Sequence, residues 1–540
     1  MQKNSVINPW GIVPYVVLVI FVLPILIVIS SIFGEWSENW SHLYEYVLFD
    51  YIYNSSVLVI GVLFFAFILG TTSAWLVTSY QFPGKDFLEW ALILPLAIPS
   101  YILAYTFTGL FDTYGTVNIM MRDLLSLEEN ISLFPNVRNL YGAIIVFSFT
   151  LYPYVYLVTR SAFLNQSQSM LEAGRLLGLN NIQIFYKLGV PIIRPAIIGG
   201  LMLVAMETLS DFGAVEHFAI QTFTTGIFRT WYGMYDIKTA MQLASMLLVF
   251  VGLFVMLEKY TRDNAKYTSK SSTYKPKELK KLTGHKGFLV SAFCFLPIFV
   301  GFILPISELS IWMFSYNLNF FDQKFLMTAS NTLFLGIISA ILCSILALIM
   351  NFLIRLDNNK FNRIIGSLLS LGYAVPGLIL AVGIVQLFVW LDRSVFSGSD
   401  IVLTGSLIGL IIAYIIKSYA LSNSAIESGY ERISITLDES ARTLKTADFG
   451  LLSKIHFPLL KTSILTSTLI VISEVVKELP ATLILRPFNF ETLAVSTYIY
   501  AAEERMIQAS APAVAIVLIG LIPIIILTKM IRLSNVGRKQ

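Results

Sequence analysis

The stretch EAGRLLGLNNIQIFYKLGVP, Glu172 to Pro191, is a polar interruption in a very apolar chain. The stretch ESARTLKTADFGLLSKIHFP, Glu439 to Pro458, aligns with it 267 residues later without a gap. The alignment pairs chemically similar residues: Glu172 with Glu439, Arg175 with Arg442, Lys187 with Lys454 and Pro191 with Pro458. Because the same polar pattern recurs in register, the sequence predicts two tandem repeats.

The repeat extends well beyond these stretches. Downstream, the same offset pairs Glu207 with Glu474 and Asp236 with Glu503. Upstream, the offset becomes 277 and pairs Asn54 with Asn331 and Pro99 with Pro376. The first repeat therefore contains ten extra residues between its third and fourth apolar runs.

Composition decides the class of protein. The chain is 56% hydrophobic and 13% charged, with mean hydropathy +0.74, whereas soluble domains are about 25% charged. Apolar runs long enough to cross a bilayer, about 20 residues each, recur throughout. The sequence thus predicts an all-α polytopic membrane protein rather than a β-barrel, which would show shorter alternating segments. We expect twelve spans, at 12–33, 54–80, 87–111, 139–160, 193–211, 241–258, 287–306, 328–354, 362–391, 401–424, 460–480 and 512–530.

The loop charges predict the orientation. The segment 34–51 holds four carboxylates and no Lys or Arg, whereas the linker 259–286 holds nine Lys or Arg against two acids. Basic loops stay in the cytoplasm, so the linker and both termini are predicted to be cytoplasmic. An even number of spans per half makes the two six-helix repeats parallel, related by a pseudo-two-fold axis along the membrane normal.

Each repeated polar stretch reads as helix, turn and helix on the cytoplasmic side. Gly178 suits the left-handed residue that ends a helix, and Asn181 and Asp448 are predicted N-caps of the second helices. Pro191 and Pro458 break the backbone before the next span. We expect one apolar face, formed by Leu177, Ile182, Phe185 and Leu188. A helical loop lying on the membrane would explain one copy, but two copies in register suggest a twofold cytoplasmic partner.

The pattern E-A-A, three residues, G, nine residues, I-x-L-P resembles the signature of bacterial ABC importer permeases. In that family the segment is a coupling helix that sits in a cleft of the ATPase subunit. The resemblance implies MetI-like, type-1 transmembrane domains and two ATPase partners. It assigns ATPase coupling to Glu172, Ala173, Gly174, Gly178, Pro191, Glu439, Ser440, Ala441 and Pro458. The second copy departs from the pattern at Lys445, where the family has glycine.

The resemblance also sets the expected domain boundaries. They are an N-terminal helix and periplasmic loop (1–53), a first ABC transmembrane domain (54–258), a basic cytoplasmic linker (259–286), helix 7 and a periplasmic loop (287–327), a second ABC transmembrane domain (328–530) and a cytoplasmic tail (531–540).

The sequence shows no motif for nucleotide binding, metal binding or catalysis. No G-x-x-x-x-G-K-[ST] motif occurs, so ATP and Mg are expected on a separate ATPase and no cofactor on this chain. Two cysteines in apolar runs and four scattered histidines give no disulfide framework, metal site or catalytic set. We therefore predict a transport subunit with no catalytic and no metal-binding residues. Membrane lipid is an expected partner, and nucleic acid is not.

Two further stretches, Glu207 to Gly233 and Lys477 to Met506, resemble the fused permeases of bacterial ferric-iron importers, and the likeness covers nearly the whole chain. It implies a bacterial inner-membrane location and a periplasmic iron(III)-binding protein as partner. Permeases for thiamine, polyamines or sulfate are the alternatives. A secondary transporter with two six-helix halves is another, which the two EAA-like loops argue against.

Four carboxylates are the candidate pathway residues. Glu207 and Asp211, and Glu474 and Glu478, stand four apart and so share a helix face in each repeat. Ionisable residues in spans usually face a cavity or a partner, so the set predicts an acidic vestibule near the pseudo-two-fold axis. The alternative is structural: Lys477 or Arg486 neutralises the second pair, and Glu207 braces a helix end.

Tyrosines and prolines in spans three and nine have simpler expected roles. Phenolate oxygens bind iron in many proteins, but tyrosines are also common at membrane interfaces. We expect the interfacial role for Tyr101, Tyr105 and Tyr373. Pro99 and Pro376 are expected to kink their helices.

Overall fold

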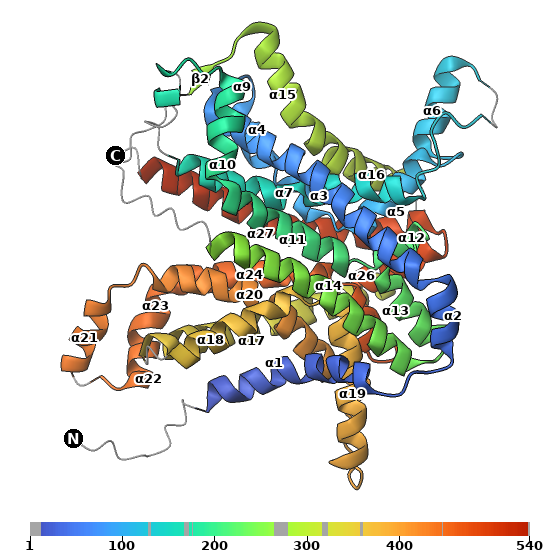
Figure 1. Ribbon diagram of the computed structural model, residues 1–540, viewed down its shortest axis with the longest axis vertical. Coiled ribbons are helices and arrows are strands. Elements are labelled where there is room, and N and C mark those ends of the chain that lie inside the picture. Colours follow the sequence, from blue (N-terminus) through green and yellow to red (C-terminus); the bar gives the residue numbers. More distant parts are fainter. Residues whose placement is uncertain are drawn as a thin grey trace.

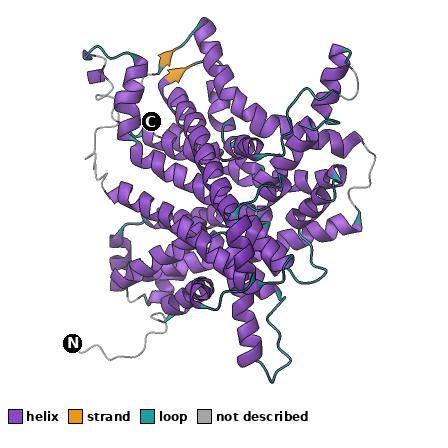
Figure 2. Ribbon diagram, turned by 45° about the vertical axis from the view of Figure 1, so that its right-hand side comes forward, coloured by secondary structure: helices purple, strands orange, loops and turns teal. Residues whose placement is uncertain are grey.

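Figure 1 shows the computed structural model, which describes residues 12–127, 131–166, 172–174, 176–263, 279–315, 322–356, 360–444 and 446–537. These residues are almost entirely helical, as Figure 2 shows. The strands among them, β1 (Tyr80–Gln81) and β2 (Lys280–Lys281), are two residues long and pair in parallel. The predicted all-α fold is confirmed.

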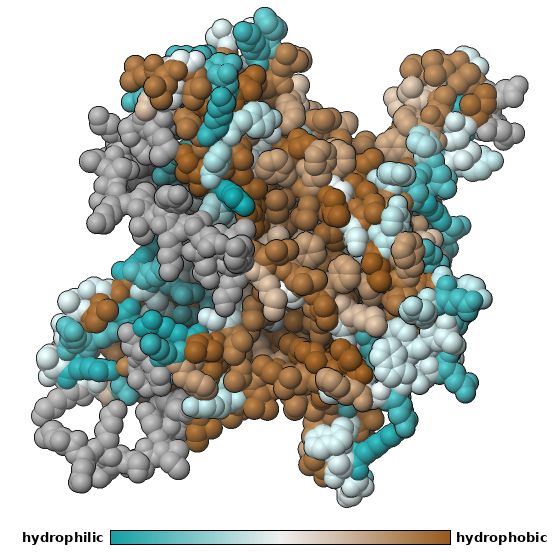
Figure 3. All heavy atoms as spheres, in the orientation of Figure 1, coloured by the Kyte–Doolittle hydropathy of each residue, from teal (hydrophilic) through white to brown (hydrophobic). Residues whose placement is uncertain are grey.

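Nine helices in the described part of the chain are long and apolar enough to cross a membrane, and three bent pairs raise this to twelve. The nine are Val13–Phe33, Leu48–Ser79, Leu140–Leu164, Ile237–Leu257, Gly284–Phe314, Gln323–Leu356, Gly377–Ser394, Leu407–Tyr430 and Met506–Ile526. The bent pairs are Lys85–Ala97 with Ser100–Leu125, Ile182–Ile192 with Arg194–Ser210, and Asp448–Leu459 with Lys461–Lys477. In Figure 3 apolar side chains cover the middle of the visible face. Hydrophilic side chains gather toward the left and right sides of the view.

The first half contains the following elements: α1 (Val13–Ser30), η2 (Ser31–Phe33), α2 (Asn39–Tyr46), α3 (Leu48–Ser79), α4 (Lys85–Ala91), η3 (Leu94–Ala97), α5 (Ser100–Phe111), α6 (Thr116–Leu125), α7 (Leu140–Leu164), α9 (Asn181–Ile184), η4 (Phe185–Gly189), α10 (Val190–Ile192), α11 (Arg194–Ser210), α12 (Gly213–His217), α13 (Phe223–Tyr232) and α14 (Ile237–Asp263).

The second half contains α15 (Gly284–Ile298), η5 (Phe299–Ile303), α16 (Leu304–Ser315), α17 (Gln323–Leu356), α18 (Lys360–Ser370), η6 (Leu371–Ala374), α19 (Gly377–Ser394), α20 (Leu407–Tyr430), α21 (Ile435–Thr443), α22 (Asp448–Leu451), η7 (Leu452–His456), α23 (Phe457–Leu459), α24 (Lys461–Lys477), α25 (Pro480–Leu485), α26 (Leu493–Ala502) and α27 (Met506–Gly537).

The two halves exchange their first helices. Helix α1 packs against α18 and α19 of the second half, where Tyr15 stacks on Phe361 with ring centroids 5.4 Å apart. Helices α15 and α16 pack in turn against α4 and α5 of the first half. A Cβ on Gly301 would lie 2.6 Å from the carbonyl oxygen of Phe149, so glycine permits this close approach. The exchange joins the repeats into one helical body.

Two predicted spans, 87–111 and 362–391, are not single helices. The first divides into α4, η3 and α5 and bends by 94°, and the second into α18, η6 and α19. Pro99 and Pro376 each stand just before the new helix. Ile98 and Val375, which precede them, are extended, because proline disfavours helix in the residue before it and cannot donate to the preceding turn. The expected kinks are therefore complete breaks.

The segment between the third and fourth predicted spans, where the first repeat has its ten extra residues, contains a helix that the sequence pattern did not predict. Helix α6 projects from the body in Figure 1, on the side opposite α21 and α22. Thr116, its first residue, donates a hydrogen bond to Glu308 of α16. Most of the basic linker lies outside the described residues, but the backbones of Lys280 and Lys281 pair with those of Tyr80 and Gln81 while the two lysines remain exposed.

Candidate functional site

The predicted acidic pairs lie where α11 and α24 end and the chain turns into the short helices α12 and α25. The Oδ1 atom of Asp211 accepts hydrogen bonds from the backbone of Ala214 (2.9 Å) and Val215 (3.4 Å). At the same repeat position Glu478 accepts them from Ala481 (3.1 Å) and Thr482 (3.0 Å). Bracing a helix end, which the sequence suggested for Glu207, is thus done by Asp211 and Glu478.

All four carboxylates line one cavity of about 90 Å³ between the halves. Its other polar lining residues are Ser100, Tyr101, Thr150, Tyr154, Ser210, Lys417 and Lys477. The structure therefore brings together the pairs that the repeat alignment matched, Glu207 with Glu474 and Asp211 with Glu478. Room for a few water molecules in a lining this polar makes the cavity a hydrated chamber rather than a packed core.

Two lysines partly neutralise this chamber. Lys477 Nζ lies 3.2 Å from Glu474 Oε2, as one alternative expected, and Lys417 Nζ lies 3.5 Å from Glu478 Oε1. Arg486 instead donates to the carbonyl oxygen of Phe490 at 3.5 Å. Lys417 was missed, although a single lysine inside the run IIAYIIKSYALS carries the usual signal of an intramembrane functional residue.

The lysines break the symmetry of the chamber. The repeat offset of 267 places Thr150 opposite Lys417 and Ser210 opposite Lys477, and all four residues line the cavity. The acids are thus contributed equally by the two halves, whereas the cations come from the second half alone. The chamber contains four carboxyl groups and two lysines, and this excess of acidic over basic groups favours cations over anions.

The three tyrosines are buried, so the predicted interfacial role is wrong. Tyr373 donates a hydrogen bond of 2.5 Å to Glu207 Oε1. The hydroxyls of Tyr101 and Tyr105 are buried and have no hydrogen-bond partner among the described residues. Both belong to α5, which the break at Pro99 directs into the interior instead of along a bilayer surface.

We call residues 172–193 the first loop and residues 435–460 the second loop. In the first loop Glu172 and Ala173 are exposed, and Gly174 is buried beneath Leu188. Gly178 has φ +79°, and Leu179 N–H donates to the carbonyl of Gly174 at 3.1 Å, so the predicted helix end is confirmed. Lys445, the equivalent position in the second loop, lies outside the described residues.

The N-cap of the first loop is Asn180 and not Asn181, which is already the first helical residue. Asn180 Oδ1 accepts from Gln183 N–H at 2.8 Å, and Gln183 Oε1 accepts from Asn180 N–H at 3.0 Å, a reciprocal cap. The second loop has Ala447 at the N-cap position with no side-chain cap, and Asp448 is the first helical residue.

The expected apolar face is only partly formed. Phe185 packs on Trp75 with ring centroids 5.4 Å apart, and Leu188 covers Gly174. Leu177 and Ile182 are 82% and 69% exposed. A π-turn at Phe185–Gly189 shifts the helical register, and Leu177 precedes the turn at Gly178, so the four side chains cannot share one face.

The bends predicted at the loop prolines are present two residues later. The axis turns by 74° between Ile182–Ile192 and Arg194–Ser210, and by 75° between Asp448–Leu459 and Lys461–Lys477. Pro191 and Pro458 each lie in the first turn of the short helix before the bend. Glu439 and Ser440 are exposed on α21, whereas Ala441 is buried.

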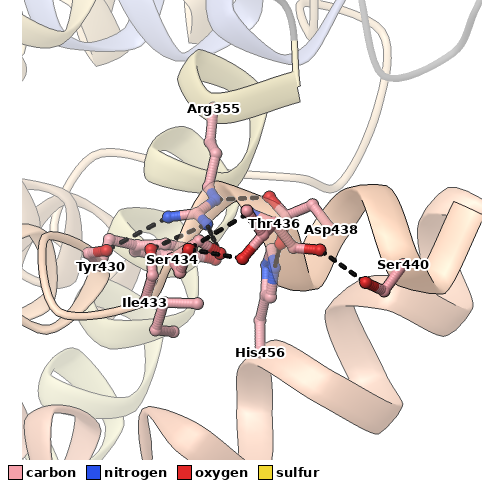
Figure 4. Close-up of polar contacts among 8 residues, drawn as sticks. All are labelled: Arg355, Tyr430, Ile433, Ser434, Thr436, Asp438, Ser440 and His456. Carbon is pink, nitrogen blue, oxygen red and sulfur yellow. Dashed lines mark hydrogen bonds and ion pairs between the residues drawn. The ribbon is translucent and has the colours of Figure 1, made fainter.

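A polar network, shown in Figure 4, holds the second loop. Arg355 Nε donates to Asp438 Oδ2 at 2.6 Å, and its other nitrogens donate to the carbonyls of Tyr430, Ile433 and Ser434. His456, fully buried, bonds Asp438 Oδ1 through Nε2 at 2.9 Å. Burial alone would raise the pKa of Asp438, but the hydrogen bonds from Arg355 and His456 outweigh it and lower the pKa.

Sequence comparison identifies the family. The description "binding-protein-dependent transport system inner membrane component" applies to two matched segments, residues 66–257 and 343–535, one in each half. The chain belongs to this family. It is therefore a multi-pass inner-membrane component of a binding-protein-dependent ABC transport system, and members of the family are transport components rather than enzymes.

Individual relatives differ in how much of the chain they match. The Fe(3+)-transport system permease protein FbpB 2 of Haemophilus influenzae is 26% identical over 481 residues, covering 88% of this chain and 89% of its own. The ferric transport system permease protein FbpB of Actinobacillus pleuropneumoniae is 23% identical, over 72% of this chain and 56% of its own. The sulfate permease CysT of Salmonella typhimurium is 27% identical over only 27% of this chain.

Proposed function

We propose that the chain forms the transmembrane pathway for iron(III) in an ATP-driven importer, receiving the ion from a periplasmic iron(III)-binding protein. The observation that carries the proposal is the chamber between the halves, with acids from both repeats and an excess of carboxylates over lysines. Hard cations prefer oxygen ligands, and a negatively charged cavity repels a dianion such as sulfate. Likeness to a ferric permease over 88% of the chain supports the same choice.

Coupling to ATP hydrolysis is assigned to the two loops. Each presents an exposed glutamate, Glu172 or Glu439, on the side of the bundle where α1 begins and α27 ends (Figure 1). The charge of the linker supports the cytoplasm as this side. Two ATPase subunits there bind ATP and Mg, and closure of their dimer moves both loops together. Pro191 and Pro458, next to the 74° and 75° bends, connect this movement to α11 and α24.

The coupled spans end at the chamber. Helix α11 carries Glu207 in its last turn and is followed by Asp211; α24 carries Glu474 and is followed by Glu478. A movement of either loop therefore reaches a carboxylate pair through a single helix of 17 residues. Alternating access then follows from changing the distance between the two pairs.

The test is uptake of radiolabelled iron(III) by cells with and without this chain, before and after ATP depletion. We expect uptake that requires both the chain and ATP. The variant Glu207→Gln/Glu474→Gln should reduce uptake while leaving the amount of the chain in the membrane unchanged. Iron uptake that is unchanged without the chain would overturn the assignment of iron, and uptake of labelled thiamine, polyamine and sulfate would then be measured with the same strains.

A further inference from the structure

A second cavity, of about 220 Å³, shares α5 and α12 with the central chamber. Its lining residues are Tyr105, Arg138, Glu216, His217, Tyr498, Ala501, Ala502 and Glu504. At its rim Arg138 pairs with Glu504 at 3.4 Å, and the side chain of Glu504 is 74% exposed. The cavity thus opens at the surface, and the helices α5 and α12 that contribute to it lie on the side of the bundle opposite the two loops in Figure 1.

His217 lines this cavity and keeps a lone pair on one ring nitrogen. Thr108 Oγ1 donates to the carbonyl of Ala104 at 3.0 Å, so its oxygen accepts the hydrogen bond of 2.9 Å that joins it to His217 Nε2. The proton of the neutral imidazole is therefore on Nε2, and Nδ1 is left as an acceptor. Glu216, the preceding residue, lines the same cavity, and its carboxylate also accepts hydrogen bonds of 3.3 Å from Arg229.

Two tyrosines connect the cavities. Tyr105 lines the outer one and Tyr101 the central one, and their rings are 5.8 Å apart on consecutive turns of α5. Tyr105 also meets His217 edge-on, with ring centroids 4.6 Å apart. Both hydroxyls are buried without a partner among the described residues. Because an unsatisfied buried hydroxyl costs about 1–3 kcal/mol, its retention points to a ligand that the hydroxyls bind.

This polar line belongs to the first half only. At the corresponding repeat positions the second half has Leu378 for Tyr101, Val382 for Tyr105 and Ile484 for His217. Tyr101 lines the central chamber together with Asp211, and at the positions equivalent to Lys417 and Lys477 the first half has Thr150 and Ser210.

We propose that the outer cavity is a staging site for a hard trivalent cation, which passes from Glu216 and His217 along Tyr105 and Tyr101 to Asp211. The proposal rests on the proposed function and adds to it a route through one half only. Each phenol that coordinates the ion through its oxygen releases one proton to water in the adjoining cavity. No group of three or more His, Cys, Asp or Glu in the described ranges has metal-binding geometry.

The experiment uses the purified full-length chain in lipid nanodiscs with iron(III) added as its citrate complex. Iron(III) bound to phenolate absorbs visible light by charge transfer, so the difference spectrum against citrate complex alone reports tyrosine coordination. We expect a band with the wild-type chain, a weaker band with Tyr105→Phe or Tyr101→Phe, and none with the double variant. Tyr53→Phe, which alters an exposed tyrosine of α3, is the matched control and keeps the band.

Melting curves separate this role from a structural one. Removing an unpaired buried hydroxyl should leave the melting temperature of Tyr105→Phe unchanged or raised, whereas Tyr152→Phe, which loses a bond to the carbonyl of Leu92, should lower it. Absence of the band in the wild-type chain, or its persistence in the double variant, overturns the staging site. If cells still show chain-dependent iron uptake in that case, the proposed function stands and only the route is wrong.

Discussion

The two loops occupy the same position in their repeats but are held by different chemistry. The first loop is held by Trp75 of α3, which packs against Phe163 of α7 and Phe185 of the loop, at 5.1 and 5.4 Å between ring centroids, and whose ring lies over Gly189. The equivalent residues of the second half are Phe352, Tyr430, Leu452 and His456. There His456 contacts Phe352 and Tyr430 edge-on, at 5.4 and 5.3 Å, and joins Asp438 and Arg355.

The two halves differ in the size and polarity of the side chains at two facing positions. A large ring at 75 faces a glycine at 189, whereas a smaller ring at 352 faces a histidine at 456. A Cβ on Gly189 would already lie 3.3 Å from Trp75, so histidine fits only where tryptophan is absent. Similar bends of 74° and 75° show that the loop geometry survives this exchange. Shape is thus the shared feature, and each half reaches it with its own contacts.

The largest effect is expected for Trp75→Ala. Truncating a buried tryptophan that two aromatic rings contact should cost about 3–5 kcal/mol. Limited trypsin digestion can report the two loops separately, since Lys187 and Lys454 are exposed at the same repeat position. Cleavage at Lys187 should accelerate strongly and cleavage at Lys454 should not. Equal acceleration at both sites would show that the loops are not anchored independently.

A somewhat smaller loss is expected for Arg355→Ala. The change removes one of the two partners of Asp438 and the side-chain donor of three backbone carbonyls, and breaking a buried ion pair costs roughly 3 kcal/mol. Cleavage should now accelerate at Lys454 and remain slow at Lys187. Thr78→Ala, at the equivalent position of the first half, is the matched control and should change little, because among the described residues Thr78 donates to carbonyls of its own helix, α3. No change in the Arg355 variant would mean that the network does not hold the loop.

Asn180→Ala tests the cap that only the first loop possesses. Loss of the reciprocal bonds with Gln183 should destabilise the start of α9 by about 1 kcal/mol. Hydrogen exchange at Ile182 to Ile184 should quicken, with no change at Phe449 to Leu451, where Ala447 provides no side-chain cap. Unchanged exchange in the variant would assign the stability of α9 to packing alone.

The smallest effect is expected for the protonation of Asp438, and it is seen only at acidic pH. Because the pKa of Asp438 is lowered in the folded chain, its stabilising contribution is present above the usual carboxyl value of about 4 and is lost as the pH falls below it. Pepsin cleavage of the second loop should therefore rise below about pH 4 relative to the first loop. In Asp438→Asn the ratio should be independent of pH. A wild-type ratio that does not change with pH would contradict the role of this carboxylate.

Local signals and repetition made much of the fold predictable. Gly178, Pro191 and the matched acids act through backbone conformation or helix spacing, which the sequence displays directly. The breaks at Pro99 and Pro376 were expected only as kinks, because a proline does not reveal whether neighbouring helices will support two separate segments. The N-cap was misplaced by one residue, since Asn180 and Asn181 have equal cap propensity.

Contacts between distant residues were not predictable. Arg355 lies 83 residues from Asp438, and Lys417 lies 61 residues from Glu478, so only the tertiary fold reveals these partners. Tyr101 and Tyr105 were expected at a membrane interface because burial depends on where α5 points after its break. Lys477 was named from the sequence as a partner of the second acidic pair, and the lone lysine of an apolar span, Lys417, was a visible signal that the sequence analysis did not use.

The central claim, that two differently anchored loops both couple one pathway to ATP, is tested most directly by iron(III) uptake in loop variants. ATP-dependent uptake should be measured for Glu172→Ala, Glu439→Ala and the double variant, each at equal levels of chain in the membrane. We predict partial loss in each single variant and complete loss in the double variant. Normal uptake by the double variant would contradict the account.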